Sequence, residues 1–210
     1  MARNTDTSFA RTYQGDPPTR HILGTENLAL IADMSPLVAG HLLLLPKTHY
    51  LSFSHVIDDH LPELMNFVET IAPLYRETFG ELLVLEHGSS AEGNGNACIT
   101  HAHWHLLPVD GAEVDRIIQA DRLAYTDLTD LAELGSPRWT PRPYFYRCHG
   151  GHMRVYEPSP TTRRQYLRSV VGAVLSIETP LWDYALVIRK ELLRETMRRV
   201  RQWPRTEVAQ

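Results

Sequence analysis

The sequence predicts an α+β fold, in which short buried strands and one long helix are followed by a C-terminal helical region. Three observations support this prediction. Four apolar runs have the length of strands, one long segment before the third run has helical spacing, and two further helical patterns lie near the C-terminal end. The length of 210 residues suits one domain with an extension, or two small lobes.

The expected strands are short and are bounded by turn-forming residues. They cover residues 27–33, 41–46, 82–86 and 101–108. The second strand follows Gly40 and ends at Pro46, which lacks a backbone donor and therefore stops a central strand. Residues 88–96, between the third and fourth strands, are rich in Gly, Ser and Asn, so we expect a loop there.

The longest expected helix covers residues 59–79. Its apolar positions at helical spacing are Leu61, Leu64, Met65 and Val68. Asp58 or Asp59 can cap its N-terminus, and Gly80 can end it. Pro73 lies inside this segment and predicts a kink, because proline removes a backbone hydrogen bond and its ring clashes with the preceding turn.

The pattern changes character after residue 110. A short helical piece at 114–123 is followed by a proline-rich stretch at 136–143, which excludes regular structure there. Residues 144–156 predict a β-hairpin that turns at Gly150-Gly151. The chain therefore divides into an N-terminal arm (1–20), a main domain (21–110), a connecting region (111–160) and a C-terminal helical region (161–210).

The C-terminal helical region is rich in arginine. We expect one helix from Thr161 or Thr162 to about residue 175 and a second from about residue 181 to 202. Their basic residues are Arg163, Arg164, Arg168, Arg189, Lys190, Arg194, Arg198, Arg199 and Arg201. These side chains form a solvated face, or one or two of them bind an anionic group of a ligand, such as a phosphate.

Composition excludes several classes of protein. A net charge of −4 disfavours binding to polymeric nucleic acid but permits one local phosphate site. Cys98 and Cys148 are too few for a disulfide framework. Residues 1–14 lack a signal-peptide core, and the longest apolar run, residues 42–45, is far shorter than the ~20 residues of a membrane helix. We therefore expect a soluble cytoplasmic protein without a membrane partner.

The most informative segment is the histidine-rich strand at residues 101–108. Side chains of a strand alternate between two faces, so His101, His103 and His105 share one side. The other side carries the core-type residues Ala102, Trp104 and Leu106. This apolar partner face argues against a row of solvated surface histidines, because it places the strand inside the fold.

Two kinds of chemistry suit such a row of imidazoles. Histidines two apart on a strand can share a zinc ion, with a further ligand from His87 or from the group Cys148, His149 and His152. Alternatively, a neutral imidazole attacks phosphorus while its neighbours fix its tautomer and donate protons. The Gly- and Asn-rich residues 93–100 favour phosphoryl chemistry, because their backbone N–H groups can surround an anion.

These residues resemble the histidine triad (HIT) superfamily of nucleotide hydrolases and transferases. The family motif is His-φ-His-φ-His-φ-φ, where φ is apolar, and residues 101–107 fit it. Residues 25–28, 32–36 and 39–49 also look like the family's first half, so the resemblance covers roughly residues 21–110. It implies an α+β fold with an antiparallel sheet and one main helix, here with a C-terminal helical extension.

The resemblance implies a role for each histidine. His103 would be the nucleophile that forms a nucleotidyl-histidine intermediate, and His101 and His105 would support it and contact the phosphate. His41 would be the fourth histidine beside the triad. No metal ligand and no cofactor is required by this scheme, although a divalent metal can accompany a polyphosphate substrate.

The resemblance also implies a nucleotide-binding set. Asp33 would accept hydrogen bonds from the ribose, and Ile31 and Met34 would hold the base. The remaining members of the set would be Glu86, Asn96, Ala97 and Cys98. Two departures from the family pattern concern substrate selection. Cys98 stands where relatives often carry Ser or Thr, and Leu85-Glu86-His87-Gly88 stands where many have Asn-Glu-Gly.

The expected function is hydrolysis of a nucleoside phosphate ester or anhydride at the α-phosphate, which releases a nucleoside monophosphate. Expected substrates are small molecules, such as a dinucleoside polyphosphate or a nucleotide conjugate. Three alternatives remain at this point: a nucleotidyltransferase or phosphorylase with the same intermediate, a non-catalytic nucleotide-binding regulatory protein, and a zinc hydrolase. Relatives are often homodimers, so the resemblance makes a homodimer one expected state.

Overall fold

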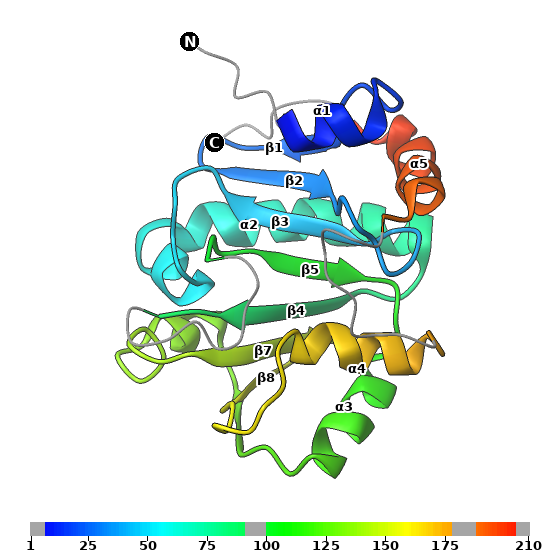
Figure 1. Ribbon diagram of the computed structural model, residues 1–210. Coiled ribbons are helices and arrows are strands. Elements are labelled where there is room, and N and C mark those ends of the chain that lie inside the picture. Colours follow the sequence, from blue (N-terminus) through cyan, green and yellow to red (C-terminus); the bar gives the residue numbers. More distant parts are fainter. Residues whose placement is uncertain (1–6, 91–99, 178–187, 205–210) are drawn as a thin grey trace.

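The computed structural model describes residues 7–90, 100–177 and 188–204. Within these residues, the centre is an antiparallel sheet with strand order β1-β2-β3-β5-β4-β7-β8-β6 (Figure 1). The strands are β1 His21–Gly24, β2 Leu28–Ala32, β3 Leu42–Pro46, β4 Leu83–Gly88, β5 Trp104–Leu107, β6 Tyr125–Leu128, β7 Tyr144–His149 and β8 His152–Tyr156.

Helices cover both faces of the sheet. They are α1 Thr7–Tyr13, α2 Phe53–Phe79, α3 Gly111–Ala120, α4 Tyr166–Val174 and α5 Lys190–Arg199, with short 3₁₀ turns at Leu131–Gly135 and Val200–Gln202. The long helix α2 packs on one face, while α3 and α4 pack on the other, over β4 and β7 (Figure 1). This arrangement confirms the α+β class, the antiparallel sheet and the single main helix.

The four expected strands are present as β2, β3, β4 and β5, but the last is shorter than predicted. Regular pairing of β5 begins at Trp104, so His101 and His103 precede the strand. The alternation of faces still holds, because Ala102, Trp104 and Leu106 are each about 2% exposed in the core under α2.

The hairpin predicted at residues 144–156 is confirmed as β7 and β8. Gly150 and Gly151 form its turn with φ values of 58° and 82°. Two consecutive residues with positive φ match the twist of the flanking strands, and glycine adopts this conformation without steric cost. The hairpin pairs with β4, so residues assigned to the connecting region extend the sheet of the main domain (21–110).

Helix α2 departs from its prediction at two points. It begins at Phe53, and its non-helical residue is His60 (φ −136°, ψ 22°), not a residue near Pro73. Pro62 explains the kink, because it removes the hydrogen bond to the carbonyl of Asp58 and opens the turn before it. Pro73 lies within the helix without a comparable distortion.

The N-terminal arm contains structure that we did not predict. Residues 7–13 form α1, in which Phe9 and Tyr13 stack with ring centroids 4.8 Å apart and are buried. The hydroxyl of Tyr13 donates to the carbonyl of Met34 (2.9 Å). Strands β1 and β6 were also not predicted. Within the described residues, we find no helix with the length and apolar character needed to cross a membrane.

Gly88, at the end of β4, leaves space that Tyr144 fills. The two residues are directly paired, and a Cβ atom on Gly88 would lie 2.4 Å from Cζ of the Tyr144 ring. The ring cannot shift freely, because its hydroxyl donates to Glu86 (2.9 Å) and accepts from the N–H of Ser54 (3.0 Å).

We therefore expect Gly88→Ala to lower the free energy of unfolding by about 1–3 kcal/mol, the usual cost of overpacking. Urea unfolding followed by fluorescence measures this change. An unchanged unfolding midpoint would show that Tyr144 yields more easily than its two hydrogen bonds imply.

Candidate active site

Three histidines on adjacent segments form a continuous polar row. His41 immediately precedes β3, His105 lies on β5, and His103 lies just before β5. Nε2 of His41 is 2.8 Å from Nδ1 of His105, and the rings of His103 and His105 have centroids 4.7 Å apart. The pairing of Leu43 with His105 brings β3 and β5 into this register.

Hydrogen bonds fix which nitrogen carries the proton in each ring. The N–H of Leu37 donates to Nδ1 of His41 (3.2 Å), so the proton of neutral His41 lies on Nε2. That Nε2–H therefore donates to Nδ1 of His105, which leaves the proton of His105 on its own Nε2. A backbone N–H at residue 37 thus determines the tautomer of two histidines.

The tautomer of His103 is fixed independently of His41 and His105. Its Nδ1 is 2.8 Å from the carbonyl oxygen of His101, and because a carbonyl only accepts, Nδ1 carries the proton. Nε2 of His103 is consequently unprotonated and keeps its lone pair. Burial lowers the pKa of His103, and this effect exceeds the opposing effects of the bond to His101 and of the Asp33 charge. The ring is therefore neutral at pH 7.

Burial keeps the neighbouring rings neutral as well. It lowers the pKa of His41 to about 4, despite the nearby Asp33. It also lowers the pKa of His105 well below its usual range, and His103 and His41 lower it further. Neutral imidazoles at these positions can provide both a lone pair and N–H donors at physiological pH.

His101 faces a different partner from the other members of the predicted triad. Its Nε2 lies 2.7 Å from the carbonyl oxygen of Pro46, at the end of β3. Its ring packs edge-on against His49, with centroids 5.3 Å apart. Its connection to His103 is through its own backbone carbonyl, so His101 orients the predicted nucleophile.

Asp33 lies beside the row and is 1% exposed. One carboxylate oxygen accepts from the N–H of Ser35 (2.6 Å), and the other lies 3.6 Å from Nε2 of His41 and 3.7 Å from Nη1 of Arg168. Burial alone would raise the pKa of Asp33, but His41, Arg168 and the Ser35 N–H outweigh it and lower the pKa. The carboxylate predicted to bind ribose is thus ionised and paired with a cation.

The other predicted nucleotide-binding residues are placed differently. Ile31 is half-buried on β2, two residues before Asp33, whereas Met34 packs against the core under α2. Glu86 turns away from the histidine row into that core, where it accepts from Phe53, Trp104 and Tyr144. We therefore correct its assignment: Glu86 is a core residue. Asn96, Ala97 and Cys98 lie outside the described residues.

His87 belongs to the row, although the sequence suggested it only as a zinc ligand. Leu85 pairs with His105, and His87 follows two residues later on the same side of β4. Its Nε2 accepts from the N–H of Leu167 on α4 (3.0 Å). Burial, with smaller effects of His103 and Arg168, lowers the pKa of His87 to about 3. The two-residue period of β4, combined with its register against β5, would have been enough to predict that His87 lies beside His105.

One cluster in the described part of the chain has the composition of a metal site. Asp33, His41 and His105 each offer a ligand atom, and these atoms lie within 4.8 Å of one another. The two histidines already bond to each other through His41 Nε2 and His105 Nδ1. Asp33 already faces the Arg168 cation, whose positive charge would repel a metal ion. Among the described residues, Cys148, His149 and His152 do not form such a cluster, and His149 pairs with Glu81 (2.9 Å).

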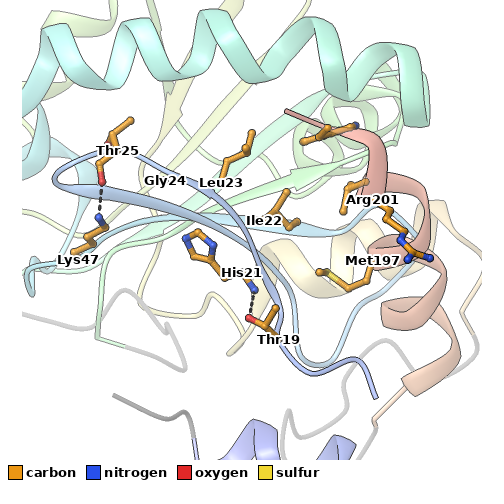
Figure 2. A pocket seen from close by; sticks show the side chains of 11 residues that line it. Thr19, His21, Ile22, Leu23, Gly24, Thr25, Lys47, Met197 and Arg201 are labelled. Atoms are coloured by element: carbon orange, nitrogen blue, oxygen red, sulfur yellow. Dashed lines mark hydrogen bonds between the residues drawn. The ribbon is translucent and has the colours of Figure 1, made fainter. Parts of the chain in front are cut away.

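A groove of about 330 Å³ lies beside β1, and it is distinct from the row (Figure 2). It is lined by residues of β1, by Lys47 and by Met197, Val200, Arg201 and Trp203 of the C-terminal region. Figure 2 shows Lys47 reaching the Thr25 carbonyl, with His21 nearby. None of the histidines of the row lines this groove, so the groove is not the site around His103.

The antiparallel sheet and the row of neutral histidines, of which His41 is buried and the others are half-buried, define an α+β protein with a histidine-based site. Residues 14–112 match the HIT domain family, so this part of the chain is similar to HIT proteins. An adenosine 5'-monophosphoramidase of Candida albicans is 23% identical over 119 residues, which are 51% of this chain and 73% of that protein. An uncharacterized HIT-like protein of Methanocaldococcus jannaschii is 27% identical over 48% of this chain and 76% of its own length.

Solved structures of HIT proteins are also similar to this chain. A hypothetical histidine triad nucleotide-binding protein from Sulfolobus tokodaii has 23% identity and a TM-score of 0.36, and covers 48% of this chain and 67% of its own. A zinc-bound histidine triad family protein from Mycobacterium smegmatis has 23% identity and a TM-score of 0.36. The match covers 61% of this chain and 86% of that protein.

Proposed function

We propose that the protein hydrolyses a nucleoside phosphate ester or anhydride at its α-phosphate through a nucleotidyl-histidine intermediate. The observation that carries this proposal is the fixed tautomer of His103. Its Nδ1–H is bonded to the His101 carbonyl, and its pKa is lowered, so Nε2 is an unprotonated nucleophile at neutral pH. The name of the Candida albicans relative, a monophosphoramidase, supports the same reaction class.

The proposed reaction has two steps. Nε2 of His103 forms a bond to the α-phosphorus, the bond to the leaving group breaks, and the leaving group departs with the electron pair and takes a proton from solvent. Water then attacks the phosphorus, the bond to Nε2 breaks with its electron pair returning to His103, and the proton of the water is released to solvent as the nucleoside monophosphate leaves. The Nε2–H of His105 is the neighbouring donor for a phosphoryl oxygen, since its Nδ1 is occupied by His41.

A screen of nucleotides and nucleotide conjugates against the wild type and His103→Asn tests this proposal. Release of a nucleoside monophosphate by the wild type without added phosphate supports hydrolysis. Turnover that requires phosphate or another acceptor would instead identify a phosphorylase or transferase with the same intermediate. Equal turnover by both proteins would exclude His103 as the nucleophile.

The lowered pKa of the row predicts the pH dependence of activity. The reactive form of His103 is neutral, and a depressed pKa keeps it neutral to lower pH than an ordinary histidine, whose pKa is 6.5. The acidic limb of the kcat/KM profile should therefore lie below pH 6.5. An inflection at or above that value, measured on a substrate that does not titrate in this range, would contradict a neutral nucleophile at His103.

A further inference from the structure

The loop that joins β2 and β3, residues 33–41, is held by the C-terminal region. Three contacts reach its backbone: a guanidinium nitrogen of Arg168 donates to the carbonyl of Ser35, Arg189 donates to the carbonyl of Leu37 (3.3 Å), and the N–H of Gly40 donates to Oγ1 of Thr196 (2.8 Å). Arg168 lies on α4, Thr196 lies on α5, and Arg189 immediately precedes α5. All three lie beyond residues 14–112, where the HIT domain matches.

This loop carries the groups that determine which ring nitrogens are protonated in the histidine row. Its first residue is Asp33, and its last is His41. Between them, the N–H of Leu37 donates to Nδ1 of His41 and so places the proton of that ring on Nε2. A displacement of residues 35–37 would release Nδ1, and His41 would no longer be fixed as the donor to His105.

Of the three contacting residues, Arg168 reaches both the backbone of the loop and the Asp33 side chain. It is 8% exposed, and Nη1 lies 3.7 Å from the Asp33 carboxylate while Nη2 bonds to Ser35. Its neighbour Leu167 donates its N–H to His87, so α4 contacts the row at Leu167, and it contacts Asp33, beside the row, at Arg168. The planar guanidinium can engage a carboxylate and a carbonyl together, which the ammonium of lysine cannot do with the same geometry.

We propose that Arg168 is a positioning residue for the reaction at His103, and that α4 completes the active site in the same chain. Arg168 holds Asp33 and the Ser35 carbonyl, the loop holds the Leu37 N–H against His41, and His41 directs the proton of His105. This inference rests on the proposed function for its kinetic consequence. Its structural consequence, the tautomer of His41, can be measured without any substrate.

The kinetic test uses Arg168→Met, Arg168→Lys and a matched control, Arg164→Met. Arg164 is exposed and lies four residues earlier, just before α4. We expect kcat to fall about 10²-fold in Arg168→Met, the size expected when a reacting group is misplaced by about 1 Å. KM should change less than kcat, Arg168→Lys should recover part of the loss, and Arg164→Met should match the wild type.

The second readout is the ¹⁵N NMR spectrum of the histidine rings in the substrate-free protein. The wild type should show His41 as the Nε2–H tautomer and His105 with its proton on Nε2. Arg168→Met should lose this single pattern at His41, whereas Arg164→Met should keep it. The spectrum remains informative if no nucleotide proves to be a substrate, so failure of the proposed function is distinguishable from failure of this inference.

Removing Arg168 leaves the buried Asp33 charge uncompensated, which can destabilise the fold. Thr196→Val therefore serves as a second variant, because it removes only the acceptor for Gly40 and the bond from Thr196 to Leu192. A folded Arg168→Met with wild-type kcat and unchanged histidine tautomers would overturn the proposal. If that variant does not fold, unchanged kcat and tautomers in both Arg168→Lys and Thr196→Val would overturn it.

Discussion

His103→Asn is expected to reduce hydrolysis of a nucleoside phosphate substrate by at least about 10⁴-fold, the range seen when a catalytic nucleophile is removed. The amide N–H of asparagine can still donate to the His101 carbonyl, as Nδ1 of histidine does, so the backbone before β5 keeps its partner. What is lost is the unprotonated Nε2 that would bond to phosphorus. Steady-state rates on one substrate measure the effect, and unfolding curves show whether the variant remains folded.

His152→Asn is the matched control, because His152 is exposed at the start of β8 and lies outside the row. It should retain wild-type activity. Rapid acid-free denaturation of the wild type with labelled substrate should trap label in an acid-sensitive, base-stable linkage, and His103→Asn should trap none. Label on the variant, or a loss smaller than tenfold, would show that another group attacks the phosphorus.

The parts of this site that could be predicted from sequence depend on short-range patterns. Alternation along residues 101–106 placed His103 and His105 on one side and Trp104 in the core, as observed. The Gly150-Gly151 turn was recognisable because positive φ values at both positions favour glycine. Such features involve neighbouring residues, so the local order of residue types is enough to specify them.

Features that depend on long-range contacts were harder to predict. Arg168 resembles the other arginines of the C-terminal region in sequence, and only the packing of α4 against the row brings it to Asp33, 135 positions earlier in the chain. Helix α1 is too short for a clear helical period, and it is stabilised by burial of Phe9 and Tyr13. In α2 we predicted a kink at Pro73, but the distorted residue is His60, just before Pro62, although both prolines lie inside the helix.

Glu86 shows why the family resemblance alone misplaced a residue. The resemblance placed Glu86 in the nucleotide-binding set, but strand alternation turns its side chain to the opposite face from Leu85 and His87. There, burial raises the pKa of Glu86 to about 7, although the three donors Phe53 N–H, Tyr144 O–H and Trp104 Nε1–H each lower it. The carboxyl group joins the start of α2 to β5 and β7.

We expect Glu86→Ala to lower the free energy of unfolding by at least about 4 kcal/mol. It leaves buried donors without an acceptor, at about 1–3 kcal/mol each, and opens a cavity beneath α2. Glu86→Gln is a milder variant that keeps the volume but leaves one donor unsatisfied, so we expect a loss of about 1–3 kcal/mol. Urea unfolding at pH 6 measures both, and losses below 1 kcal/mol would contradict a structural role.

The raised pKa of Glu86 also predicts how stability depends on pH. The folded protein binds this proton more tightly than the unfolded chain, whose Glu pKa is near 4.5, so the favourable contribution is complete below pH 4.5 and is lost as pH rises through about 7. The difference in unfolding free energy between the wild type and Glu86→Gln should therefore shrink from pH 5 to pH 8. A difference that stays constant over this range would show that the buried carboxyl group is already ionised at pH 5, with its three donors outweighing the cost of burial.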